Sequence, residues 1–255
     1  MWSHGKTSGD IESGTTSEQP LLYPMMSESP ELRWAFIRKI YTIVSIQLLL
    51  TAAVSSVVVF VPAVSHYILY THAGLSLYIA ILITPLIILC LLACFHQKHP
   101  VNFILLGIFT VAVSMSVGLS CALTSGKIIL EAAVLTAVVV VSLTMYTFWA
   151  SKRGYDFNFL GPFLFASLIV LIVFAIIQVF FFLFIFQIFF PLGKIGTMIY
   201  EGVGAIIFCG YIVYDTDNLI KRYSYDEYIW ASVNLYLDII NLFLHLLRLL
   251  KAADS

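Results

Sequence analysis

The stretch LGPFLFASLIVLIVFAIIQVFFFLFIF occupies residues 160–186 and contains no Asp, Glu, Lys or Arg. An α-helix rises 1.5 Å per residue, so about 20 apolar residues cross the roughly 30 Å hydrocarbon core of a bilayer. This run is therefore long enough to span a membrane. The rest of the chain is similar in character, because 61% of its 255 residues are hydrophobic and only 11% are charged. A soluble domain carries about 25% charged residues, so lipid is the expected solvent of this fold.

Six more apolar stretches of spanning length lie on either side of this run. Pro, Gly and charged residues mark the breaks between them. The seven stretches cover residues 41–62, 77–95, 101–123, 128–150, 160–186, 198–218 and 229–250. Closed β-barrels are the other spanning architecture, but they are built from short alternating segments. The sequence therefore predicts an all-α membrane protein with seven transmembrane helices.

The beginning of the chain differs from everything that follows. Residues 1–32 are rich in Gly, Ser, Thr, Glu and Pro and show no apolar period. Such a segment buries too little surface to offset the entropy of ordering. We expect residues 1–32 to form a disordered cytosolic tail, followed by a seven-helix transmembrane domain at residues 33–255.

The basic residues are divided unevenly between the two sides of these spans. Nine of them lie in the tail and in the loops after spans 2, 4 and 6, whereas the opposite loops carry only Lys127 and Lys194. The nine are Lys6, Arg33, Arg38, Lys39, Lys98, Lys152, Arg153, Lys221 and Arg222. Because cytosolic loops carry the excess of Lys and Arg, we predict a cytosolic N-terminus. The net charge of −1 leaves no broad basic surface for nucleic acid.

The cysteines give no sign of a metal site, and no cofactor is expected. Cys90, Cys94, Cys121 and Cys209 all lie inside apolar runs, rather than in the loops where disulfide frameworks and zinc sites occur. Cys90 and Cys94 share a helix face, but no His or second Cys pair stands at ligand spacing. We interpret the four cysteines as packing residues.

The polar residues of the last span follow one line along the helix. Spacings of 4, 3, 4 and 3 residues keep them within about 40° of one another at 100° per residue. They are Asn234, Asp238, Asn241, His245 and Arg248. The same arithmetic puts Glu201, Gly204, Tyr211, Asp215 and Asn218 on one face of the preceding span. Two polar stripes on consecutive helices predict that these helices face each other.

The two aspartates of these stripes are expected to meet. Asp215 lies near the cytosolic end of the sixth span, and Asp238 follows about nine residues into the seventh, roughly 13 Å by helical rise. Ionisable groups at membrane depth usually face a cavity or a partner and mark a pathway. Two carboxylates at low dielectric constant share a proton and titrate as a unit. The alternative is separate neutralisation, of Asp215 by Lys221 or Arg222 and of Asp238 by Asn234.

Two further acidic residues open spans on the opposite side. Glu131 is near the start of the fourth span and Glu201 near the start of the sixth. Acidic groups there could concentrate cations at a pore mouth. A solvated helix N-terminus also favours a negative charge, and the sequence does not decide between these interpretations.

Three stretches resemble the Bax-inhibitor family, in its Lifeguard branch. They are RKIY at residues 38–41 leading to QLLLT at 47–51, GYIVYDTD at 210–217, and LYLDIINLF at 235–243. The segment PELRW at residues 30–34 is similar to plant members in particular. The resemblance covers about residues 30 to 250, and the motif in the last span is the most specific part of it.

The resemblance implies a fold and a function. The fold is two three-helix layers around a central seventh helix. The function is a calcium leak, sensitive to pH and gated by an aspartate pair that would also hold calcium transiently, here Asp215 and Asp238. It further implies suppression of cell death, with regulatory membrane proteins as partners. The membranes implied are the endoplasmic reticulum and related endomembranes, with the Golgi, vacuole and plasma membrane as further locations.

The same resemblance implies a latch, and the polar face of the last span supplies candidate pore residues. In bacterial relatives an arginine at the cytosolic end of the second span latches one of the aspartates. Here that position reads HQKH at residues 96–99, so His96 is the nearest match and Lys98 the nearest fixed cation. Asn234, Asn241 and His245 are the candidate polar residues of the pore.

Other function classes remain open at this point. Aspartates on the sixth and seventh spans also define presenilin-type proteases, but those need Gly-x-Gly-Asp where this chain has LYLD at residues 235–238. We therefore expect no enzymatic activity. A proton-coupled transporter is disfavoured because the spans show no inverted repeat. The main alternative to a channel is a membrane scaffold that regulates cell death through protein partners.

Overall fold

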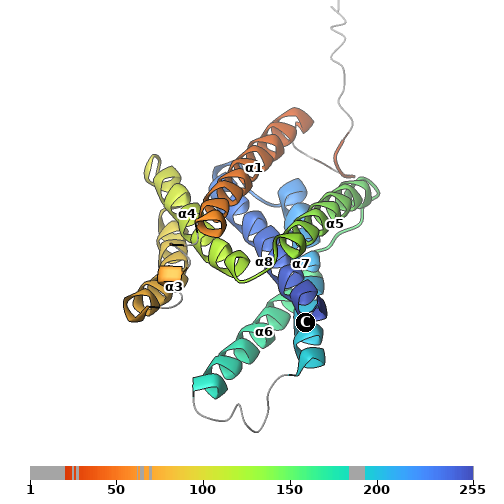
Figure 1. The fold of residues 1–255 in the computed structure, drawn as a ribbon. Helices are drawn as coiled ribbons and strands as arrows, with labels where there is room; N and C mark the ends of the chain where they lie inside the picture. Colours follow the sequence, from red (N-terminus) through yellow and green to blue (C-terminus); the bar gives the residue numbers. More distant parts are fainter. Residues whose placement is uncertain are drawn as a thin grey trace, which may run out of the picture.

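The computed structural model describes residues 21–24, 26, 29–61, 63, 66–68, 71–183 and 193–254. Within these ranges the chain is helical, as Figure 1 shows. The elements are α1 (Pro30–Phe60), α3 (His72–Phe95), α4 (Val101–Ala122), α5 (Gly126–Lys152), α6 (Leu160–Leu183), α7 (Lys194–Lys221), the 3₁₀ turn η2 (Tyr225–Glu227) and α8 (Tyr228–Asp254).

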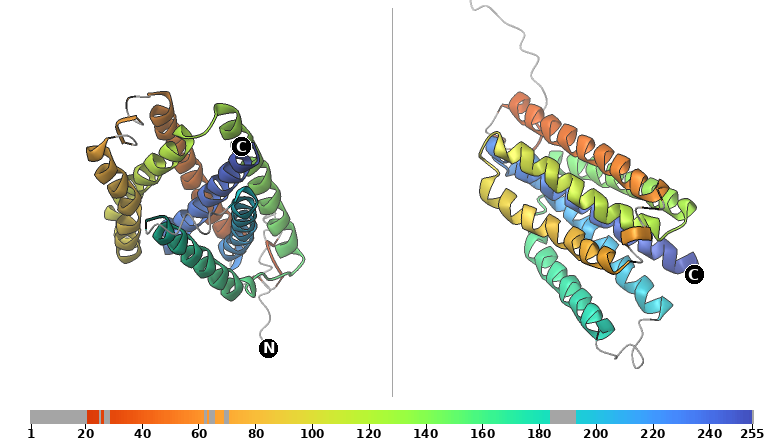
Figure 2. Two further views of the ribbon diagram at one scale, coloured as in Figure 1. Left: turned by 60° about the horizontal axis from the view of Figure 1, so that its bottom comes forward. Right: turned by 60° about the vertical axis from the view of Figure 1, so that its left-hand side comes forward.

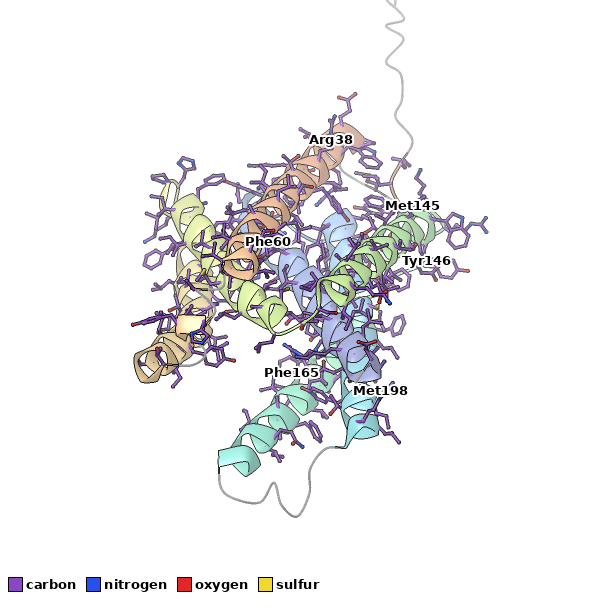
Figure 3. All side chains as sticks on the ribbon, in the orientation of Figure 1. Arg38, Phe60, Met145, Tyr146, Phe165 and Met198 are labelled. Carbon is purple, nitrogen blue, oxygen red and sulfur yellow. The ribbon has the colours of Figure 1, made fainter. Side chains whose placement is uncertain are left out.

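The seven α-helices are each long and apolar enough to cross a membrane. Large apolar side chains also cover the outside of the bundle: Phe60 is 81% exposed and Met145 is 67% exposed. Figure 3 labels Phe60 at the end of α1, and Met145 and Tyr146 on α5. A surface of this kind suits lipid tails rather than water. The prediction of an all-α membrane protein with seven transmembrane helices is confirmed.

The first helix begins earlier than the apolar pattern predicts. Its first residue is Pro30 rather than residue 41, and Ser29 precedes it as the N-cap residue. Proline suits the first helical position because its missing N–H would have no partner there, and Glu31 in the first turn complements the helix dipole. A hydropathy pattern does not show this earlier start, because the first turns of the helix carry the charged residues Arg33, Arg38 and Lys39.

The helices form two groups of three around α8. One group contains α1, α3 and α4, with α4 packed on both α1 and α3. The other contains α5, α6 and α7, with α7 packed on both α5 and α6. Helix α8 contacts α1 and α4 on one side and α5 and α7 on the other, and Figure 2 shows it enclosed between the groups. The predicted arrangement of two three-helix layers around the last helix is confirmed.

Buried hydroxyl groups join α8 to the first group. The Tyr236 hydroxyl lies 2.7 Å from Thr51 Oγ1, and Ser114 Oγ donates to the same Thr51 oxygen at 3.1 Å. Beside them, Ser55 Oγ donates to the Ser114 carbonyl at 3.0 Å. Small hydroxyl residues let helices approach closely in lipid and hydrogen bond across the interface. These bonds fix how α8 is rotated, and so which of its faces meets α7.

The end of the predicted tail is part of the fold. Leu22 is 1% exposed and packs with Phe36, Ile37, Leu219 and Ile220. The predicted boundary at residue 32 is therefore too late, because Leu22 and the first turn of α1 belong to the folded domain. Because the segment is polar overall, its composition does not indicate that Leu22 is buried. Residues 1–20, 25, 27 and 28 of the predicted tail lie outside the described residues.

Candidate functional site

The site lies between α7 and α8, at the end of the bundle where α1 begins and where η2 connects these two helices. We call this the N-terminal end, and the end where α8 finishes the C-terminal end. Asp215 of α7 and Asp238 of α8 are 7% and 6% exposed, and their side chains lie within hydrogen-bonding reach of each other. The predicted meeting of the two aspartates is therefore what the structure shows.

The aspartates open onto a polar cavity of about 400 Å³. Its polar lining comes from three asparagines and three tyrosines: Asn218, Asn234, Asn241, Tyr211, Tyr214 and Tyr223. Apart from the two carboxylates, the polar part of the lining thus consists of neutral amides and phenols. Within the described residues, the inner oxygen of Asp238, Oδ2, has no hydrogen-bond donor. A buried acceptor without a donor is costly, and it provides a place for a proton or a cation.

The nearby cations are engaged by a different aspartate. Asp217 is fully buried, and its carboxylate lies 2.6 Å from Lys221 Nζ and 3.0 Å from the Arg222 guanidinium. Ser151 Oγ donates to Asp217 at 3.1 Å. Two residues along a helix correspond to a turn of about 200°, so Asp217 faces α5 while Asp215 faces α8.

This arrangement excludes one of the two interpretations of Asp215. Neither Lys221 nor Arg222 forms an ion pair with Asp215 in the part of the chain that the structure describes. Asn234, the proposed partner of Asp238, donates its amide to the Tyr223 hydroxyl at 2.9 Å. The aspartate pair therefore has no fixed cation among the described side chains. Sequence reasoning missed Asp217, although its spacing of four residues from Lys221 is typical of a helical ion pair.

Arg33 holds the backbone of Tyr223, which lines the cavity, and was not predicted as a site residue. Its guanidinium donates to the Tyr223 carbonyl at 2.7 Å and the Leu219 carbonyl at 3.5 Å, and the residue is 2% exposed. It thereby caps the C-terminal end of α7, where a cation is favoured. Burial and the nearby Asp215 carboxylate raise the pKa of Tyr223, so the phenol is neutral at cellular pH.

The proposed latch residues face other partners. His96 Nδ1 lies 2.8 Å from the Ala93 carbonyl, and its ring lies beside Trp230. Lys98 lies over the ring of Phe95 at 5.1 Å. Neither forms an ion pair with the aspartates among the described residues, so in this conformation the latch is not engaged.

The two glutamates of the proposed pore mouth lie in different environments. The Glu131 side chain is 49% exposed and lies 3.8 Å from Lys127. Glu201 is 5% exposed and contacts His245 of α8, with Nδ1 to Oε2 at 2.6 Å. No hydrogen bond or ion pair joins the two glutamates within the described residues. The described side chains also contain no group of three or more His, Cys, Asp or Glu that could hold a metal ion.

Comparison with known proteins identifies the family. A family model described as "Inhibitor of apoptosis-promoting Bax1" matches residues 33–255. The chain belongs to the Bax1-I family. This member is 64% identical over 255 residues to Protein LIFEGUARD 2 of Arabidopsis thaliana, with 100% of each chain covered. It is 35% identical over 229 residues to Protein lifeguard 4 of Mus musculus, with 90% of each covered.

A viral relative adds a further name. The Golgi anti-apoptotic protein of Vaccinia virus (strain Lister) is 36% identical over 229 residues, with 90% of each chain covered. The resemblance inferred from the motifs of the first, sixth and seventh spans is thus confirmed, including its Lifeguard branch.

Proposed function

We propose that this Bax1-I family protein is a calcium leak channel of endomembranes that suppresses cell death, and that Asp215 and Asp238 form its gate. The observation that carries the proposal is a buried pair of carboxylates in a polar cavity without a compensating cation among the described side chains. Burying such a pair is expensive, and Lys221 and Arg222 are close in sequence yet bind Asp217 instead.

The chemistry of the lining favours a cation that passes rather than one that stays. Calcium prefers six to eight oxygen ligands, and the cavity offers carboxylate, amide and phenol oxygens around Asp215 and Asp238. Two carboxylates are fewer than most tight calcium sites contain, which suits weak, transient binding and release. When the pair shares a proton the negative charge is halved, and cation binding weakens. Calcium and protons therefore compete for the same oxygens.

A second cavity extends the first along α8. It measures about 450 Å³ and is lined by Asn241 and His245. The two cavities share Asn241, Leu237, Phe208 and Leu168 as lining residues. Asn234, Asp238, Asn241 and His245 therefore follow one route through the bundle, the one that the spacing of polar residues in the last span predicts. Polar residues that line connected cavities are expected of a transport route, and a purely structural core would not need them.

The cellular part of the proposal is supported by the relatives. The mouse relative carries the name lifeguard, and the vaccinia relative is named an anti-apoptotic protein of the Golgi. We place the protein in the endoplasmic reticulum, the Golgi or another endomembrane, with its N-terminus in the cytosol. Cell-death regulators in the same membrane are its expected protein partners, and no cofactor is needed.

The test is calcium flux into liposomes that contain the purified protein, measured from acid to alkaline pH. Wild type should show a flux that changes with pH. In Asp215→Asn and Asp238→Asn the remaining carboxylate has no like-charged neighbour, so the pH of that change should shift in both variants. Asp254→Asn, an exposed residue at the end of α8, makes the same change of charge far from the pair and should follow wild type.

Two results would decide against parts of the proposal. Superimposable pH curves for all four proteins would show that the aspartates do not gate the flux. A wild-type protein that carries no calcium at any pH, yet protects cells from death, would identify a scaffold instead of a channel.

A further inference from the structure

A second buried charge cluster lies between α7 and α8 near the C-terminal end of the bundle, where α7 begins and α8 finishes. Glu201 Oε2 is 2.6 Å from His245 Nδ1 and 3.6 Å from the Arg248 guanidinium. The Glu201 and His245 side chains are only 7% and 9% exposed, while that of Arg248 is 45% exposed. We call these three residues the Glu201 cluster. Unlike the aspartate pair, this carboxylate is fully engaged by its neighbours.

The contact between α7 and α8 is built around the imidazole ring of His245. An added Cβ at Gly204 would meet the ring atom Cε1 at 2.4 Å and Nδ1 at 2.5 Å, so no larger residue fits without displacing the ring. The rings of Phe208 and Tyr200 lie on the other sides, with centroids 5.4 Å and 6.1 Å from that of His245. Glycine at this position is therefore required for the Glu201–His245 contact.

The cluster lies at the far end of the polar route. His245 lines the 450 Å³ cavity, and this cavity meets the aspartate cavity at Asn241. The other helices around that cavity contribute apolar side chains, such as Pro85 of α3 and Leu171 of α6. An ion that has passed Asp238 and Asn241 therefore next meets His245, and behind it Glu201.

We propose that the Glu201 cluster is a second gate of the route, which closes it toward the C-terminal end. This inference rests on the proposed function and adds a second gating site to it. With its carboxylate beside His245 and Arg248, Glu201 offers no free charge to a cation, and His245 rather than Glu201 lines the cavity. The route opens when the Glu201–His245 contact breaks. The aspartate pair and the Glu201 cluster then control opposite ends of one path.

This gate and the pore mouth predicted from sequence make opposite predictions for Glu201→Gln. An exposed mouth that gathers cations would lose flux on neutralisation, mostly at low ionic strength because salt screens exposed charges. A gate held by the Glu201 carboxylate would instead open more readily. The buried position of Glu201 favours the second outcome.

The experiment measures access to Asn241, which lines both cavities, so its readout does not depend on calcium transport. Asn241→Cys is introduced into a full-length background whose four cysteines are replaced by alanine, and the protein is placed in oriented vesicles. A membrane-impermeant thiol reagent is added on the side of the C-terminal end. Glu201→Gln should accelerate labelling about tenfold, the factor that corresponds to losing one hydrogen bond to a charged group.

Gly204→Ala provides a steric version of the same test. The added methyl group displaces the His245 ring and should also accelerate labelling. Gly202→Ala is the matched control, since an added Cβ at Gly202 meets nothing within 4 Å, and it should label at the parent rate. Thermal unfolding of each variant in detergent identifies any protein that fails to fold, and Glu201→Gln, which is nearly isosteric, then carries the result.

The outcomes separate the two proposals. Unchanged labelling in a folded Glu201→Gln variant overturns the second gate and leaves the cluster a structural contact, whatever the calcium flux shows. Faster labelling supports the gate. If that faster labelling occurs in a protein that carries no calcium, the proposed channel function fails while the closure of a water-filled route by Glu201 stands.

Discussion

Asp215 and Asp217 stand two residues apart on α7 and have opposite surroundings. Asp217 faces α5 and is held by Lys221, Arg222 and Ser151. Asp215 faces α8 and meets a second carboxylate, that of Asp238. Both are buried, so burial alone does not separate a structural acid from a functional one. What separates them is whether a cation lies beside the carboxylate, because Lys221 and Arg222 at the end of α7 bind Asp217 and not Asp215.

The comparison assigns different tasks to the two interfaces of α7. At the interface with α5, Lys221 and Arg222 bind Asp217, and Arg222 also binds Asp156 in the loop between α5 and α6. The interface with α8 leaves its acids uncompensated beside a cavity. A buried carboxylate whose charge is neutralised by neighbouring cations stabilises the fold. Two buried carboxylates without a cation repel each other, and an ion or a proton can relieve this unfavourable interaction.

The largest expected effect is the loss of stability on replacing Asp217. In Asp217→Asn the Lys221 and Arg222 side chains lose their buried partner, and removing one member of a buried pair costs about 3–5 kcal/mol. Asp215→Asn changes the same chemical group on the same helix, yet it removes a like-charge contact and should leave stability unchanged or raise it. Thermal unfolding of both variants in one detergent measures the difference.

An equal loss of stability in both variants would contradict the distinction between Asp215 and Asp217. A larger loss in Asp215→Asn would identify Asp215 as the structural residue.

A smaller effect is expected at Arg33, which joins the first turn of α1 to the end of α7. Arg33→Ala removes hydrogen bonds from a cation to the Tyr223 and Leu219 carbonyls, and one such bond is worth about 1.5–3 kcal/mol. Because Tyr223 also lines the aspartate cavity, the pH profile of flux should shift as well. Arg33→Lys keeps the charge without the planar fork of donors and should recover part of both properties. An Arg33→Ala variant with normal stability and an unshifted pH profile of flux would show that Arg33 does not act on the aspartate pair.

The smallest effect is expected at Asp156, in the loop between α5 and α6. Partial burial disfavours its charge, but the Asn158 N–H and the Arg222 guanidinium hold the pKa of Asp156 below its usual value. A carboxyl whose pKa is lower in the folded state stabilises the fold above its unfolded pKa of about 3.9, and this contribution disappears as the pH falls. Asp156→Asn should therefore cost about 0.2–1 kcal/mol at pH 7, as exposed pairs do. At pH 3 the difference from wild type should shrink, and a constant difference across this range would exclude the ion pair as its cause.

The sequence was sufficient to predict the fold because lipid imposes one simple requirement. A spanning helix needs about 20 apolar residues, and the run at residues 160–186 meets it without ambiguity. The meeting of Asp215 and Asp238 was predictable for a related reason. Polar residues in a membrane helix are few, so their spacing along α7 and α8 shows directly which faces meet.

The remaining features depend on contacts that a one-dimensional pattern does not contain. The four-residue spacing of Asp217 and Lys221 permits their ion pair, but the sequence does not show that Asp217 is buried against α5, where Ser151 donates to it. Glu201 begins a span near the membrane surface, yet Gly204 lets His245 approach and cover it. Leu22 lies in a short apolar stretch of an otherwise polar segment, and its burial depends on α7, nearly 200 residues later.

The four cysteines have a consequence for where this fold can be assembled. All of them are free: Cys90, Cys94, Cys121 and Cys209 form no disulfide. The helices are joined by hydroxyl contacts such as Thr51 to Tyr236 and by hydrogen bonds such as Ser151 to Asp217, neither of which requires an oxidising environment. Disulfides are confined to oxidising compartments, but packing and hydrogen bonds are not. None of these contacts between helices therefore requires that either compartment bordering the membrane be oxidising.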